Sequence, residues 1–557
     1  MSQTVGTEQQ AASFLSKLFR RKNLDAILAE QDKQAHKLER SLTAFDLVIF
    51  GVGAMIGAGI FVMTGSAAAG SDGHLAAGPA LTLSFVLTGI VCTFCALCYS
   101  EFAAMAPISG SAYTYAFSTL GEFVAWIIGW ALVLEYAVGN MAVAVGWTGS
   151  IKEFINPYLQ QYAGFTLPTW LTSNTVDTVS SMSAIADPSL VINAIPVTIP
   201  FIGDHDPLIL LIQRAFNLPA FLVVLAVTLL LLRGVSESAR TAAVMVFTKT
   251  LVILLFIGVG FAFLFGGNMP VLQHNWFANG WTTFAPNGFA GILTGASTIF
   301  FAYIGFDAVA TAAEETKNPQ RDIPIGIIGS LAICTVLYIL VTSVITGVVP
   351  LTQINREAAV VGAMLKMGIE WASLVVSIGA IAGLTSVLLV LQMAGVRIFY
   401  AIARDGLLPK MLATIDPKFH TPSVCTILVG IFVALGSGLL PINLLAEMCN
   451  IGTLGAFLVV CLGVAILRYT DPKRHRPFRV PFGLLFPILG IAGCVFVMSG
   501  LPLVTWIVTG LWFLLGMVIY FSYGFWNSAL AKRPGIVIEE SEMEVVMHGG
   551  VSSINGA

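Results

Sequence analysis

Long apolar runs dominate this chain and restrict the folds that it can adopt. Of its 557 residues, 57% are hydrophobic and only 10% are charged, and the mean hydropathy is +0.87. Such values are typical of integral membrane proteins rather than of large soluble proteins. The sequence therefore predicts an all-α polytopic membrane protein.

Twelve of the runs are long enough to cross a membrane, since a spanning helix needs roughly 20 apolar residues. They cover approximately residues 42–69, 79–106, 122–148, 218–234, 243–266, 287–312, 325–349, 371–396, 422–440, 442–467, 483–500 and 502–523. The stretch 183–202 is also apolar on average, but it contains Asp187, Asn193 and three prolines. We assign that stretch to a loop.

The basic residues indicate the orientation, because cytoplasmic loops collect Lys and Arg. With both termini inside, twenty-one of the 27 Lys and Arg residues lie on the cytoplasmic side, whereas the outer loops hold Lys152, Arg214, Arg356 and Lys366. A thirteenth span at 183–202 would invert every later loop and remove this asymmetry. We therefore expect a multi-pass protein of the cell membrane with both termini in the cytoplasm.

The predicted organisation has five parts. Residues 1–40 form a cytoplasmic leader with a possible amphipathic helix, and residues 530–557 form a disordered cytoplasmic tail. Spans 1–5 make a first repeat at 41–266, which includes an outer loop at 149–217 with no assigned function. Spans 6–10 make a second repeat at 287–467, and spans 11 and 12 occupy 483–523.

Several classes of function lose support at this point. The formal net charge is -3, so no basic surface indicates a nucleic acid partner. Cys92, Cys95 and Cys98 have a spacing that could face a metal, but no His lies near them, and small packing residues are the simpler interpretation. All seven His residues lie in loops or tails, so we expect no enzyme, metal or cofactor.

Ionisable residues inside spans are costly and are therefore candidates for function. Lys249 in the fifth span is a plausible proton carrier, with a structural ion pair as the alternative. Glu135 in the third span could pair with Lys249, contact a substrate, or act as a neutral hydrogen-bonding group between helices. Asp307 in the sixth span is best explained as the cap of a restarted helix.

Two spans are interrupted by glycine, at Gly53–Phe61 in span 1 and Phe300–Asp307 in span 6. The alternative, close helix packing at Gly53 and Gly57, explains only the first. The interrupted spans begin on opposite sides of the membrane, as in an inverted repeat. Matching interruptions indicate a substrate site at the midplane, where free N–H groups donate hydrogen bonds to an anionic group and freed carbonyls bind a cation. An amino acid zwitterion supplies both.

These residues resemble a known family. The sequences Gly57-Ala-Gly-Ile-Phe61, Leu134-Glu-Tyr136, Phe300-Phe-Ala-Tyr-Ile-Gly-Phe-Asp-Ala308 and Ala403-Arg-Asp-Gly-Leu-Leu-Pro409 are similar to those of the amino acid-polyamine-organocation superfamily, cationic amino acid transporter branch. The resemblance covers about residues 40–525. It implies the LeuT-like five-plus-five inverted repeat, with spans 1 and 6 discontinuous and two extra helices.

The resemblance also implies roles for individual residues. Backbone at Gly57, Ala58 and Gly59 would hold the substrate carboxylate, although Ala58 stands where the family often has Ser. The break from Ala302 to Gly305 would complete the site. The carbonyls of Ile56, Phe301 and Ile304 would bind the substrate amine, and Phe301 would also act as an aromatic gate. Leu384 would limit the size of the substrate side chain. Lys249 would bridge spans 1, 5 and 8 and couple transport to protons.

The sequence thus predicts proton-coupled symport of an amino acid by alternating access, with Lys249 as the coupling group and Glu135 tuning it. The expected partners are a cationic or neutral amino acid, protons and membrane lipid. Exchange or sodium coupling is an alternative, although a fixed cation at 249 argues against sodium there. A ligand-gated channel or membrane amino acid sensor has less support, because signalling domains and rings of charge are missing from the sequence.

Overall fold

The computed structural model describes Leu18, Arg20 and residues 42–70, 74–105, 111–174, 178–180, 194–199, 208–213, 216–233, 239–416 and 421–529. The predicted amphipathic helix of the leader and the predicted disordered tail lie outside the described residues. Their interpretation stays a prediction.

Each predicted apolar run contains a helix. In chain order these are α3 (Ala44–Met55), continued by η1 (Gly59–Met63) and α4 (Thr64–Ala69); α5 (Leu81–Met105); α7 (Glu122–Val133), continued by η3 (Leu134–Val138) and α8 (Gly139–Ala163); α11 (Leu218–Leu232); α12 (Ala239–Phe263); α15 (Gly288–Ile299), continued by η6 (Phe300–Tyr303) and α16 (Ala308–Thr311); α17 (Pro319–Val348); α19 (Glu370–Arg404); α20 (Ser423–Leu439); α21 (Ile442–Thr470); α22 (Leu485–Met498); and α23 (Leu503–Ile519).

Among the described residues, eight helices are long and apolar enough to span a membrane, and the bent pair at Ala44–Ala69 makes a ninth. Helices α11, α20 and α22 are apolar but shorter. The prediction of a nearly all-helical multi-span membrane protein is confirmed. Twelve crossings, and the division into two repeats, stay predictions.

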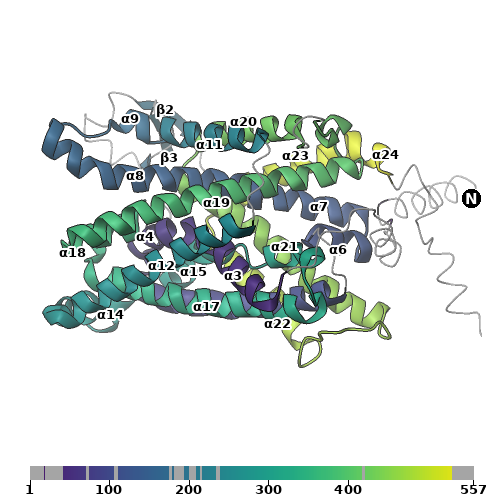
Figure 1. The fold of residues 1–557 in the computed structure, drawn as a ribbon, viewed down its shortest axis with the longest axis horizontal. Coiled ribbons are helices and arrows are strands. Elements are labelled where there is room, and N and C mark those ends of the chain that lie inside the picture. Colours follow the sequence, from purple (N-terminus) through teal and green to yellow (C-terminus); the bar gives the residue numbers. More distant parts are fainter. Residues whose placement is uncertain are drawn as a thin grey trace, which may run out of the picture.

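Shorter elements lie between these helices and flank them. They are η2 (Gly78–Ala80), α6 (Ser111–Thr119), α9 (Thr169–Thr172), η5 (Leu264–Asn268), α13 (Met269–Phe277), α14 (Trp281–Phe284), η7 (Ala313–Glu315), η8 (Leu351–Gln353), α18 (Ala359–Met367), η9 (Lys410–Ala413), η10 (Tyr520–Gly524) and α24 (Phe525–Asn527). Figure 1 shows α9, α14 and α18 at one end of the molecule and α6 and α24 at the other. The first three belong to predicted outer loops, so the arrangement follows the expected alternation of loops.

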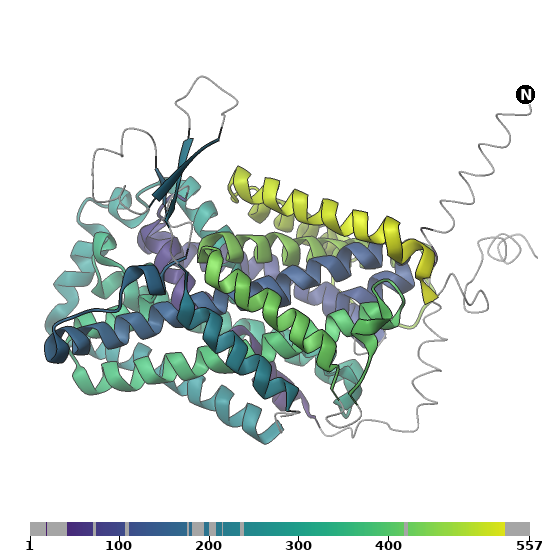
Figure 2. The ribbon, with the colours of Figure 1, turned by 90° about the horizontal axis from the view of Figure 1, so that it is seen from above.

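The loop predicted at 149–217 differs from expectation in two ways. Helix α8 continues to Ala163, so the loop begins later. The loop also contains a small antiparallel sheet of β1 (Thr178–Ser180), β2 (Ala194–Ile199) and β3 (Leu208–Gln213) in the order β1-β3-β2. In Figure 2 these strands stand off the helical bundle. Pro196 disfavours helix and is tolerated because β2 is an edge strand.

Helix contacts divide the bundle into two groups. Helix α17 packs on α3 and α5, and α15 packs on α5, whereas α8, α11, α19 and α20 pack on one another. Helix α12 contacts α3, α17 and α19, and so joins the groups. Spans 1 and 2 therefore pack with spans 6 and 7, and spans 3 and 4 with spans 8 and 9.

A buried ion-pair network lies at the end of α5. Arg468 Nη2 donates to Glu101 Oε2 at 2.5 Å, and the amide of Val480 donates to the same oxygen at 2.7 Å. Arg476 Nε lies 3.3 Å from Glu101 Oε1. The Glu101 carboxylate thus attaches the segment before α22 to α5 and α21.

Candidate substrate site

The first span is interrupted between α3 and η1. Ile56 has an extended backbone (φ −72°, ψ 99°), and the two halves of the span are bent by 45°. Within the restarted helix, Ile60 donates its amide to the Gly57 carbonyl at 3.2 Å. The first amides of a helix have no partner within it, and in the restarted helix these are the amides around Gly57, Ala58 and Gly59.

The sixth span is interrupted between η6 and α16. The chain leaves the 3₁₀ turn through Ile304, which is extended, and Gly305, whose φ is +117°. A side chain at Gly305 would be strained by that φ. Its Cβ would also lie 2.9 Å from the carbonyl carbon of Ala54, so glycine permits both the turn and the close approach to span 1.

The two interruptions meet each other directly. A Cβ atom on Gly59 would lie 2.3 Å from the Cα atom of Ala302, just as one on Gly305 would lie against Ala54. Gly53 and Gly57 also permit close packing, since their Cβ positions are 2.2 Å and 3.2 Å from Val246 and Val387 side-chain carbons. Packing and interruption therefore coexist in span 1.

Two polar side chains that the sequence analysis missed hold this arrangement. The Tyr338 hydroxyl on α17 lies 2.8 Å from the carbonyl oxygen of Met55 and 2.9 Å from that of Ala302, and shares its proton between them. Asn450 on α21 donates from Nδ2 to the carbonyl of Ser297 at 2.7 Å. Both residues are fully buried and satisfy carbonyls beside the breaks. Their signal in the sequence was a polar group deep within an apolar span.

Lys249 lies between spans 1, 5 and 8. Its side chain on α12 is 2% exposed, and Nζ donates to the carbonyl oxygen of Gly53. Its Cβ atom lies 3.3 Å from the position of a Cβ on Gly383 in α19. The structure thus brings this amine to the predicted bridging position, one turn of α3 before the first break.

The other predicted substrate residues are buried, and most of them lie at or beside the two breaks. Phe301 Cε2 lies 3.8 Å from the position of a Cβ on Gly139, and Leu384 is fully buried in α19. Ile56, Ala302 and Ile304 are 0%, 0% and 9% exposed. The candidate site is therefore closed to solvent in this structure.

The interactions of Glu135 are with Thr453 and Asp307. It lies in η3, a π-helical turn of a kind common at functional sites. Its Oε2 accepts a hydrogen bond from Thr453 at 3.0 Å. The charged group that interacts with it is Asp307, among the described residues.

The predicted capping role of Asp307 is wrong. Asp307 occupies the N-cap position of α16, but its side chain makes no capping hydrogen bond. The amides of Gly305, Asp307 and Ala308 lie near the carboxylate, but not with the geometry of hydrogen bonds. Helix α16 has only four residues, so its dipole would stabilise a capping carboxylate only weakly.

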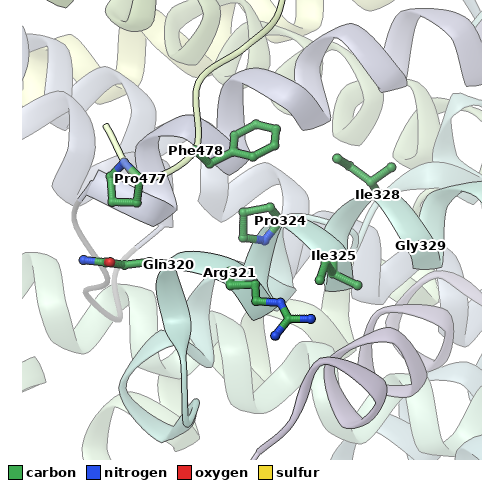
Figure 3. Close-up of a pocket in the computed structure, with 8 residues that line it drawn as sticks. All are labelled: Gln320, Arg321, Pro324, Ile325, Ile328, Gly329, Pro477 and Phe478. Atoms are coloured by element: carbon green, nitrogen blue, oxygen red, sulfur yellow. The ribbon is translucent and has the colours of Figure 1, made fainter. Parts of the chain in front are cut away.

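A surface hollow of about 660 Å³ lies elsewhere (Figure 3). Its walls come from the first half of α17, including Arg321 and Ile325, and from Pro477 and Phe478 before α22. None of the predicted substrate residues lines it. The closed site between the breaks and this hollow are distinct features.

Comparison with known proteins gives a consistent result. A family model described as "Amino acid permease" matches residues 42–522. The chain is 40% identical over 520 residues to the methylthioribose transporter of Bacillus subtilis (strain 168), covering 93% of this chain and 100% of that protein. It is 40% identical over 514 residues to the branched-chain amino acid permease BcaP of the same organism, covering 92% and 99%.

A plant protein and a solved structure are also similar. Cationic amino acid transporter 4, vacuolar, of Arabidopsis thaliana is 36% identical over 461 residues, covering 82% of this chain and 68% of that protein. MhsT in complex with L-phenylalanine aligns with 84% of this chain and 100% of its own, at 13% identity and a TM-score of 0.49.

Proposed function

Because the chain belongs to the amino acid permease family, we propose that it carries out proton-coupled symport of an amino acid across the cell membrane by alternating access. The observation that carries this proposal is the meeting of the two interrupted spans. Amides of Gly57, Ala58 and Gly59 supply donors for a carboxylate. Carbonyls at Ile56, Phe301 and Ile304 supply acceptors for an ammonium group.

Lys249 supports proton coupling. A buried ammonium is stable only with acceptors around it, and the Gly53 carbonyl that it contacts belongs to the half of span 1 before the break. A change in this contact would couple the charge at position 249 to movement of α3. The same positive charge disfavours a sodium ion at that place.

The named substrates of the relatives and the residues proposed to line the site limit the choice of substrate. Branched-chain and cationic amino acids are named for relatives of this chain. Leu384 and Phe301 are apolar, and one carboxylate oxygen of Glu135 already accepts a hydrogen bond from Thr453. We favour a neutral amino acid. Methylthioribose is a second candidate, because a relative named for its transport is 40% identical.

The test is transport by the purified protein in proteoliposomes. An imposed inward proton gradient should drive accumulation of tritiated L-leucine in sodium-free buffer, and a competition panel of twenty amino acids, polyamines and methylthioribose would identify the cargo. A sodium requirement would replace proton coupling by sodium coupling, and counterflow without net accumulation would indicate exchange.

Lys249→Met should abolish accumulation while counterflow remains. Lys366→Met is the matched control, because Lys366 is exposed on α18 and its Nζ donates to the side-chain oxygen of Gln353 in η8 at 2.8 Å. Undiminished accumulation by Lys249→Met would remove Lys249 from the mechanism.

A further inference from the structure

Two buried carboxylates lie together beside the sixth-span break. Glu135 in η3 is 1% exposed and Asp307 is 0% exposed, and the two interact electrostatically. Tyr99 on α5 and Tyr136 in η3 each interact with both of them. The pair therefore lies where spans 2, 3 and 6 meet.

Most of the polar atoms in this cluster lack hydrogen-bond partners. Glu135 Oε1, both carboxylate oxygens of Asp307 and the Tyr99 hydroxyl are buried and unpaired among the described residues. Glu135 Oε2 alone has a donor, the Thr453 hydroxyl. Buried polar atoms are rarely left unsatisfied. This many unpaired oxygens in one place point to a ligand that donates hydrogen bonds.

The surroundings offer no basic side chain to this pair among the described residues, although the amides of Gly305, Asp307 and Ala308 lie near the Asp307 carboxylate. The titratable neighbours are Tyr99, Tyr136 and Cys449 on α21, and Tyr115 on α6 acts through Tyr99. Helices α3 and α17 also pack on α16 but contribute no basic group to the interactions on either carboxylate, within the described part of the chain. Two neighbouring buried carboxylates without a counter-ion cannot both be ionised at low cost.

We infer that Glu135 and Asp307 share one proton and form a second protonation site, distinct from that at Lys249. Its part in transport rests on the function proposed above. With the proton bound, one member of the pair is a neutral carboxylic acid and the other a carboxylate, and release of the proton leaves two like charges. Asp307 directly follows the Gly305 turn, so that repulsion acts on the segment that restarts span 6.

A proton fits the site better than a metal ion. Hard cations take six or more oxygen ligands, and the described residues contain no group of three or more His, Cys, Asp and Glu side chains suited to a metal. The Lys249 amine donates to the Gly53 carbonyl in span 1, whereas Glu135 and Asp307 lie in spans 3 and 6. The two sites are thus separate in composition and in the spans that they join.

Infrared difference spectroscopy of the purified full chain over about pH 5 to 9 tests this inference without any transport substrate. Wild-type protein should show a protonated carboxyl band that titrates in this range. The band should be missing from the double variant Glu135→Gln/Asp307→Asn. Each single variant should displace its midpoint by at least about one pH unit, a tenfold change in proton affinity. Glu101→Gln is the control, because Glu101 is equally buried but paired with arginine.

Three results would overturn the inference. The first is that the wild type shows no protonated carboxyl band, and the second is that the folded double variant keeps the band. The third is that sodium ions abolish the band, which would assign the site to sodium.

In proteoliposomes, the pH dependence of tritiated L-leucine counterflow should persist in Lys249→Met and be lost when Asp307→Asn is added. Loss in Lys249→Met alone would contradict a second site. If the wild type shows the band but transports no amino acid, the proposed function fails and the proton site stands.

Discussion

Replacing Gly59 with Ala tests whether the meeting of the two breaks forms the substrate site. The new Cβ would lie 2.3 Å from Ala302 Cα, 2.6 Å from its amide nitrogen and 2.6 Å from its Cβ. Ordinary contact begins at 3.4 Å, so the spans must separate by about 1.1 Å. Backbone atoms cannot rotate out of the way, and the shift falls on the atoms proposed to hold the substrate.

The expected loss of substrate affinity follows from the free-energy cost of overpacking. Inserting a methyl group into a well-packed interior costs about 1–3 kcal/mol. If that strain opposes the bound state, affinity falls about 5-fold to 150-fold, since 1.4 kcal/mol is tenfold. Equilibrium binding of the tritiated amino acid preferred in the competition panel, measured on purified protein, gives the ratio directly.

Gly258→Ala is the matched control. Gly258 lies inside α12 with nothing within 4 Å of its Cβ position, so the same chemical change adds no contact. Alanine should there stabilise the helix by roughly 0.5–1 kcal/mol and leave affinity unchanged. A folded Gly59→Ala protein with the affinity of the Gly258→Ala variant would refute the reasoning, because the breaks would then not form the site.

Two further changes test the surroundings of the breaks. Tyr338→Phe should lower affinity for the same label, because a buried carbonyl left unpaired costs about 1–3 kcal/mol. Tyr113→Phe is a control away from the breaks, because the Tyr113 hydroxyl on α6 donates to Asp405 Oδ2 at 2.8 Å. It should lower the melting temperature but spare affinity; equal losses of affinity in both variants would reject the bridging role of Tyr338. Leu384→Gly should admit larger side chains in the competition panel, with Leu388→Ala, equally buried one turn later on α19, leaving the profile intact. An unaltered profile in Leu384→Gly would exclude Leu384 from selectivity.

The spans and their breaks were predictable because local signals specify them. Apolar runs give the helices, and the glycines at 57, 59 and 305 mark the interruptions; at 59 and 305 an added side chain would meet backbone atoms. Lys249 was also visible, since a charge in the middle of an apolar span stands out against its neighbours. These signals need no knowledge of what packs against each residue.

Other features depend on contacts between distant parts of the chain. Tyr338 contacts Met55, 283 residues earlier, and nothing near position 338 reveals that partner. The association of Glu135 with Asp307 was hidden for the same reason, and a carboxylate at the start of a helix resembles a cap in sequence whether or not it bonds to the amides. The extension of α8 to Ala163 was missed because hydropathy reports where a helix leaves lipid rather than where it ends.

The contact of Gly59 with Ala302 has an evolutionary consequence. Where two spans meet through main-chain atoms, the hydrogen-bonding groups offered to a ligand are present in every residue type except proline, which lacks the N–H. Most mutations therefore leave them in place as long as the neighbouring residues stay small. Such a site would keep its hold on the amino and carboxyl groups common to all amino acids. Substitutions on α8, α19 and α21 could then change which substrate side chain is accepted. A new substrate would require no change in the main-chain groups that bind its amino and carboxyl groups.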